Sequence, residues 1–334
     1  MAYQTGDTIL DDEYNTFATG SVGGSATDSA NVNNIWGTGS GDRGYGQTTT
    51  VSAVSAGSNV TATQWSTLLS RITTIGSHQG TSLTAMTSPS AGDEIAIIGA
   101  ISSNITSLHT NRLTAAGNGT TGSSNLDSTG NWTVSNIQEV TVTFDSADEA
   151  RYYFNAGGNI QIDPQITGYT DDAKARSWNA LSQMTGTLVF TAQGSSRSGG
   201  ADTIIVTEEH TSSEVTLATT TGYYDLTTSY QTLLQRDLNT SGSPYISGGA
   251  NNIKIEAKSN GTQGSNSDAG TVITFKISCL DASSDQTYDK AEYNPLDVMD
   301  GTFRVVLSNV PPSTTYLTST WGTTARAQTS ATAT

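Results

Sequence analysis

Hydrophobic residues in the first third of the chain recur at intervals of three and four positions, the spacing of one face of an α-helix. This pattern predicts three short helices, over residues 9–17, 61–75 and 93–113. The second has the clearest start, because Thr61 or Thr63 can cap it just before the apolar stripe that begins at Trp65. The first begins with acidic residues, which suit the positive end of a helix dipole.

From about residue 131 onward, hydrophobic and polar residues alternate instead, which is typical of half-buried strands. The runs cover residues 140–144, 159–163, 188–192, 203–207, 252–258, 272–280 and 303–307. Short helices are predicted between them, over residues 146–154 and 170–184, with a helical turn at 228–237. We therefore expect an α+β, mainly β fold, in which a small helical N-terminal module precedes a β-sandwich-like domain with inserted short helices.

The polar and glycine-rich stretches predict where these parts meet. Residues 1–115 form the expected N-terminal module, and residues 116–130 read as a Gly/Ser/Thr linker. Residues 131–317 form the expected β-rich body. Residues 318–334 are polar, and we expect this tail to fray or to lie along a neighbouring molecule.

The most distinctive string lies between the first two predicted helices, where residues 37–47 contain five glycines. Such a run forces tight or left-handed backbone, and the flanking Trp36 and Tyr45 can anchor it against an apolar surface. The string superficially resembles a phosphate cradle. A dinucleotide site needs a preceding strand and a following helix, whereas the residues after Arg43 are not helical. A packing or docking loop is the better interpretation, and no cofactor is expected.

The composition indicates a protein that buries part of its apolar surface against other molecules. Hydrophobic residues make up 34% of the chain and charged residues only 13%, so Ser, Thr, Asn and Gly dominate. Threonine suits pleated strands, whereas Ser, Asn and Gly suit turns. The cores should be modest, and we expect sister copies to assemble into a homotrimer or a higher symmetric oligomer.

Charge and cysteine content exclude several classes of protein. The net charge of −16 repels phosphate backbones, so nucleic-acid binding is not expected. The single cysteine, Cys279, lies in an alternating apolar run and is interpreted as a buried structural thiol. The N-terminal residues lack a basic-then-apolar signal, and no apolar run is long enough for a membrane helix, so membrane insertion is not expected.

The side chains that could bind a metal or take part in catalysis are scattered along the sequence. The histidines are dispersed, at His78, His109 and His210, without the spacing of a zinc site. Three aspartates recur every four positions, at Asp281, Asp285 and Asp289. They suit either a solvated turn or a calcium ion, and the metal content stays open. The acidic pair Glu208 and Glu209 is the feature that a polysaccharide depolymerase could use, but the sequence favours a protein that is not an enzyme.

Two strings carry a resemblance to a known class of protein. Residues 35–47, with Trp65 and residues 78–80 downstream, resemble the N-terminal region of virion structural proteins from tailed bacteriophages, in particular phages of marine bacteria and cyanobacteria. Residues 149–158, followed by the strand-like residues 159–162, resemble a string that recurs in such proteins. Both strings are distinctive combinations of residues, but neither is tied to known chemistry.

The resemblance implies a virion component of the tail, baseplate or fibre apparatus, made in the host cytoplasm and carried outside the cell in the particle. The N-terminal module would dock to other virion proteins. The alternative is a receptor- or glycan-binding module for attachment to the host surface, and a depolymerase is less favoured. Aromatic and arginine side chains concentrate interface energy, so the predicted interface residues are Trp36, Tyr45, Trp65, Arg43, Arg151 and Tyr152.

Overall fold

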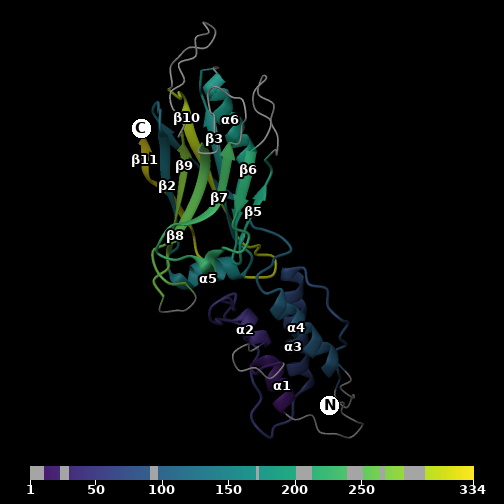
Figure 1. Cartoon of the computed structure of the whole chain (residues 1–334). Helices are drawn as coiled ribbons and strands as arrows, with labels where there is room; N and C mark the ends of the chain where they lie inside the picture. Colours follow the sequence, from purple (N-terminus) through teal and green to yellow (C-terminus); the bar gives the residue numbers. More distant parts are fainter. Residues whose placement is uncertain are drawn as a thin grey trace.

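The computed structural model of the chain describes residues 11–22, 30–90, 97–170, 173–200, 213–238, 251–263, 268–281 and 298–334. Helices α1 to α4 gather at one end of the molecule, and two sheets form the other end (Figure 1). More residues lie in strands than in helices, which confirms the predicted α+β, mainly β fold.

The described part of the N-terminal module contains four helices: α1 (Asp11–Ala18), α2 (Val32–Trp36), α3 (Ala62–Gln79) and α4 (Ile98–Thr110). A capping box between Thr61 and Gln64 starts α3, and Gly80 ends it in the left-handed conformation. The buried stripe of α3 packs with that of α4, in a hydrophobic core that continues into the β body. The sequence did not predict α2, which is only one turn long and begins at the capping residue Asn31.

The body consists of two antiparallel sheets. One has the strand order β1-β10-β3-β4-β5, and the other has the order β11-β2-β9-β8-β7-β6. The strands are β1 (Gly122–Thr129), β2 (Ser135–Thr143), β3 (Asn159–Thr167), β4 (Thr187–Phe190), β5 (Ser195–Ser198), β6 (Ser213–Leu217), β7 (Gln231–Leu238), β8 (Asn252–Ser259), β9 (Val272–Leu280), β10 (Thr302–Val310) and β11 (Ala325–Ala333).

Alternation along the strands builds the core between the sheets. Every second residue of β9 from Ile273 to Cys279 is buried, and the rings of Phe190 and Phe275 meet edge to face at 5.5 Å across the two sheets. Helix α6 (Ala173–Thr185) packs on β3 and also contacts strands of the other sheet. Helix α5 (Ala147–Asn155) lies at the end of the sandwich that faces the N-terminal helices (Figure 1).

Three sequence predictions about secondary structure are wrong. The helical turn at 228–237 is strand β7, which pairs with β6 and β8 around a bulge between Thr232 and Leu234. The expected linker contains the regular edge strand β1, paired with β10, and the expected tail contains β11, paired with β2. These edge strands are polar because they need only backbone hydrogen bonds and bury few side chains. The predicted strand at 203–207 lies outside the described residues.

Candidate functional site

The glycine-rich string forms a loop that folds back on the end of α2. Within this glycine loop, residues 37–46, the amide of Gly46 donates to the carbonyl of Gly37 at 2.8 Å. The adjacent amide of Tyr45 donates to Ile35 at 3.0 Å. Gly46 has a φ of +71°, and a β-carbon there would lie 2.5 Å from the ring of Tyr152. Glycine is therefore required for the loop to approach helix α5 so closely.

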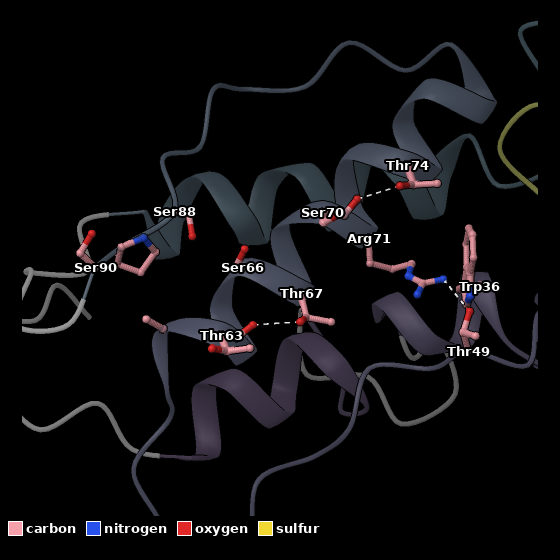
Figure 2. Close-up of a pocket in the computed structure, with 12 residues that line it drawn as sticks. Trp36, Thr49, Thr63, Ser66, Thr67, Ser70, Arg71, Thr74, Ser88 and Ser90 are labelled. Carbon is pink, nitrogen blue, oxygen red and sulfur yellow. Dashed lines mark hydrogen bonds between the residues drawn. The ribbon is translucent and has the colours of Figure 1, made fainter.

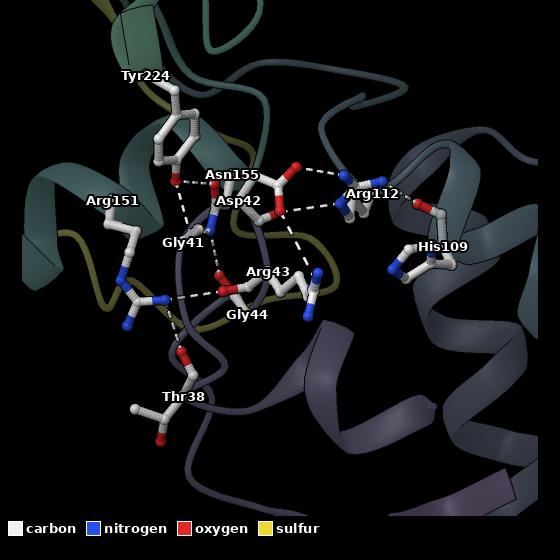
Figure 3. A network of polar contacts seen from close by, with 10 residues as sticks. All are labelled: Thr38, Gly41, Asp42, Arg43, Gly44, His109, Arg112, Arg151, Asn155 and Tyr224. Atoms are coloured by element: carbon white, nitrogen blue, oxygen red, sulfur yellow. Dashed lines mark hydrogen bonds and ion pairs between the residues drawn. The ribbon is translucent and has the colours of Figure 1, made fainter. Parts of the chain in front are cut away.

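Arg151 of α5 inserts its guanidinium into this loop (Figure 3). Its Nη1 donates to the carbonyl oxygens of Thr38 and Arg43, both at 2.8 Å. Its Nε and Nη2 donate to one carboxylate oxygen of Asp148, at 3.0 and 2.8 Å. The side chain is fully buried, so these bonds offset the desolvation of its charge.

A second set of contacts lies one turn further along α5. The Nδ2 of Asn155 donates to the carbonyls of Gly41 and Gly44, each at 3.1 Å. The hydroxyl of Tyr224, from the body, lies 2.6 Å from Asn155 Oδ1 and 2.8 Å from the carbonyl of Gly41 (Figure 3). The backbone carbonyls of the glycine loop therefore act as acceptors for side chains of the body.

The opposite side of the loop is held by the N-terminal module itself. Asp42 forms an ion pair with Arg112, just after α4, and its carboxylate also lies 3.8 Å from Arg43. Arg112 in turn donates to the carbonyl of His109 at 2.8 Å (Figure 3). Arg112 thus connects the loop to the end of α4, while Arg151 connects it to α5.

Tyr45 and His78 form the buried centre of this junction. The hydroxyl of Tyr45 donates to the carbonyl of Arg112 at 2.8 Å and accepts from Gln79 at 2.8 Å. Its ring contacts that of His78 edge to face at 5.2 Å. The Nε2 of His78 donates to the carbonyl of Ala156 at 3.1 Å, and burial lowers the pKa of His78 to about 4. The neutral imidazole is therefore the stable form in the folded chain.

Residues near the C-terminal strand complete the junction. The side-chain amide of Gln47 donates to the carbonyl of Thr318 at 2.9 Å and accepts from the Thr318 amide at 2.9 Å. The hydroxyl of Thr320 donates to the carbonyl of Tyr45 at 2.7 Å. Part of the expected tail is therefore bound to the glycine loop of the same chain.

The predicted interface residues lie inside this chain and do not form an exposed interface. Tyr45, Arg43, Arg151 and Tyr152 meet at the junction just described. Trp65 packs on Tyr14 at 5.4 Å in the helical core, and Trp36 is 5% exposed. The prediction that these side chains anchor partner molecules is corrected, because the fold buries all but the partly exposed Arg43 against its own residues.

Sequence reasoning missed several residues that build the junction. Asn155 follows Arg151 by one helical turn, and that spacing was a usable signal that both side chains face the same partner. Tyr224, Gln47 and Thr318 gave no such signal, because they are distant in sequence from the residues that they bind.

No protein-family model, curated protein or solved structure matches the chain. The site must therefore be interpreted from its own geometry. A cavity of about 550 Å³ beside the junction is lined by Asp42, Tyr224 and Asp225, among others. Asp42 is paired with Arg112, and the Asp225 carboxylate accepts from the amide of Gly222 at 2.9 Å. Both acids are thus engaged in holding the local structure.

Other predicted chemistry finds little support in the described part of the chain. There, no group of three or more His, Cys, Asp or Glu side chains is placed to hold a metal ion. Asp281 is buried, and Asp285 and Asp289 lie outside the described residues, as do His210, Glu208 and Glu209. Cys279 is buried, which confirms its interpretation as a buried thiol. Within the described ranges, no helix is both long and apolar enough to cross a membrane.

Proposed function

We propose that the chain is a non-enzymatic structural component of a bacteriophage particle, in its tail, baseplate or fibre apparatus. Two observations support the proposal. The strings at residues 35–47 and 149–158 resemble those of tailed-phage virion proteins. The same two strings contain most of the residues that bind one another at the junction, from the glycine loop on one side and α5 on the other.

The observation that carries the proposal is the buried contact of Arg151 with the glycine loop. It joins the helical module to the β body through bonds that a flexible tether would not need. A rigid connection of this kind suits a part that must transmit position or force between two neighbours in an assembly. The recurring strings are then explained as a structural joint and need no catalytic role.

Assembly with sister copies is the second element of the proposal. Among the described strands, β1 and β5 bound one sheet, and β11 and β6 bound the other. Side chains of β11 reach β1, where Gln328 donates to the carbonyl of Asp127 at 3.1 Å, but no further described strand pairs with any of these four edges. Free strand edges are natural sites for pairing between chains. In this arrangement, sister copies meet through the body, and the helical module docks to other virion proteins.

The proposal is tested with purified phage particles and with the isolated chain. We expect the chain to be present in particles at a fixed ratio to the major structural proteins, and a density map to place it in the tail region. The isolated chain should sediment as a symmetric oligomer. Absence from washed particles would contradict the virion assignment. A purely monomeric chain would contradict only the proposed assembly with sister copies.

A second candidate, attachment to a host-surface glycan, is favoured by one specific feature, a hydroxyl-lined groove on α3. In a binding assay, such a module retains an intact glycan and releases no reducing ends. Release of reducing ends would instead indicate a depolymerase.

A further inference from the structure

An open groove of about 910 Å³ runs along the outer face of helix α3 (Figure 2). Its volume lies in the range of small-molecule sites, about 300–1,000 Å³. Most of its walls are hydroxyl side chains, from α3, from Thr49 and from residues 88–90. Apolar side chains are few, with Ala62 and Pro89 among them. The residues that line the groove are not among those described above as joining the glycine loop to the body, so the proposed structural joint leaves it open.

Arg71 supplies the positive charge of this groove. Its guanidinium stacks on the ring of Trp36, 3.8 Å from the ring centroid, and its Nη1 donates to the hydroxyl of Thr49 at 3.3 Å. The chain has 30 acidic residues and 14 basic ones, yet Arg71 pairs with no carboxylate in the described structure. Burial lowers the pKa of Arg71, so its charge is partly desolvated and would gain from an anionic partner.

Two hydroxyls beside Arg71 are also available. Ser66 and Ser70 lie one turn apart on α3, both are exposed, and neither hydroxyl has a hydrogen-bond partner among the described residues. The neighbouring Thr67 and Thr74 donate to carbonyls in the preceding turn, at 2.9 Å each, and keep oxygen lone pairs free to accept. The groove therefore presents donors and acceptors around one fixed cation (Figure 2).

Trp36 forms the wall of the groove behind Arg71. It is only 5% exposed, and its indole Nε1 has no hydrogen-bond partner among the described residues. That nitrogen is itself buried, as are the indole nitrogens of Trp65 and Trp178, so Trp36 serves the groove through the ring on which Arg71 stacks.

We propose that this groove binds an acidic oligosaccharide, with a uronic acid carboxylate on Arg71 and sugar hydroxyls on Ser66 and Ser70. A saccharide suits the groove better than a peptide, because hydroxyls outnumber the apolar side chains that could anchor a peptide. The net charge of −16 opposes an anionic ligand only weakly at physiological salt, where screening acts within about 8 Å. The inference goes beyond the structural role and does not depend on it.

The test is a titration of the full chain with a short oligogalacturonate at physiological salt. Binding is measured by calorimetry or by changes in amide chemical shifts. A neutral cello-oligosaccharide of equal length and a poly-glutamate peptide are titrated in parallel. We expect the oligogalacturonate to bind and the neutral sugar to bind about ten-fold or more weakly, because a charge-assisted hydrogen bond is lost. The amide chemical shifts that change on binding should belong mainly to α3 and to residue 49.

Variants locate the site. Arg71→Gln should weaken oligogalacturonate binding about ten-fold or more, and Ser66→Glu should do so by placing a like charge in the groove without removing the stack on Trp36. Ser103→Glu, on the exposed surface of α4 outside the groove, is the matched control and should bind as the unchanged chain does. Thermal unfolding checks that each variant is folded.

Three results would overturn the inference. One is the absence of oligogalacturonate binding by the unchanged chain. Another is a folded Ser66→Glu variant that binds with unaltered affinity. The third is binding of the poly-glutamate peptide in the groove in preference to the sugar, which would assign the groove to a protein segment. None of these results bears on whether the chain is part of a virion.

Discussion

The Nε2 of His78, at the end of α3, donates a hydrogen bond to the carbonyl of Ala156, directly after α5, at 3.1 Å. These residues are 78 positions apart in the sequence, and the bond is buried. It places a titratable group at the contact between the helical module and the β body. The stability of this contact is therefore coupled to pH.

Lowering the pH should weaken the fold through His78. The folded-state pKa of His78, about 4, lies below the ordinary value of 6.5, so the unfolded chain takes up the proton first. The stability that His78 contributes is complete above pH 6.5 and is lost as pH falls towards 4, by up to about 3 kcal/mol. Urea unfolding across this range measures the loss.

His78→Gln isolates that contribution, because glutamine can keep a donor for the Ala156 carbonyl without titrating in this range. The variant should lose less stability between pH 7 and pH 4 than the unchanged chain, while the contribution of the carboxylates stays common to both. Parallel curves for the two proteins would show that His78 does not govern the acid response.

Replacing Arg151 should separate the glycine loop from α5. Arg151→Met removes the donor of the hydrogen bonds to the carbonyls of Thr38 and Arg43 and to the Asp148 carboxylate. We expect the free energy of unfolding to fall by about 3 kcal/mol, as for other broken buried ion pairs. Limited proteolysis should then cut within residues 37–46, which the unchanged chain protects. Equal protection in both proteins would show that Arg151 does not hold the loop.

Alanine substitutions at two glycines with similar backbone angles measure the packing of the loop. Gly46 and Gly57 have φ values of +71° and +77°. A β-carbon at residue 46 would meet the Tyr152 ring, whereas one at residue 57 has nothing within 4 Å. Gly57→Ala should cost about 1 kcal/mol from strain alone. Gly46→Ala should cost about 1–3 kcal/mol more from overpacking, and equal losses in urea unfolding would contradict the close contact.

Removing strand β11 should destabilise the body and expose β2. A chain ending at Thr324 loses the backbone pairing between Ala325–Ala333 and β2. We expect a lower urea midpoint and concentration-dependent association through the newly bared edge of β2, measured by light scattering. A truncated chain with unchanged midpoint and mass would show that the strand is not part of the stable sheet.

The thiol of Cys279 should resist modification while the chain is folded. It is buried among the residues between the sheets, and burial raises its pKa well above the usual range, which suppresses the reactive thiolate. A thiol-specific reagent should label no cysteine in native buffer and one per chain in urea. Rapid labelling of the native chain would show that the sheets open at β9.

The regular elements follow largely from local sequence. The capping box at Thr61 and the apolar stripe of α3 are both encoded within the helix's own stretch of sequence, so this helix could be placed before its surroundings were known. The alternation in β9 likewise identified which of its faces is buried. These signals report which residues are shielded from water, because hydrophobicity is a property of each side chain alone.

Local sequence did not show which other residues those side chains contact. Trp36, Tyr45 and Arg151 were predicted as interface anchors for partner molecules, but tertiary structure decided that they bind within their own chain. Strands β1 and β11 were missed because backbone hydrogen bonds hold them, and backbone groups are the same in every residue.

By itself, the sequence therefore determined the class of fold, the helix starts, the buried faces and the importance of the glycine loop. Only the tertiary structure decided what the loop contacts, that the C-terminal residues complete a sheet, and that Arg71 has no acidic partner among the described residues. The physical reason is that local patterns fix the burial and conformation of a segment. Which surfaces meet depends instead on shape and hydrogen-bond geometry, summed over residues far apart in the chain.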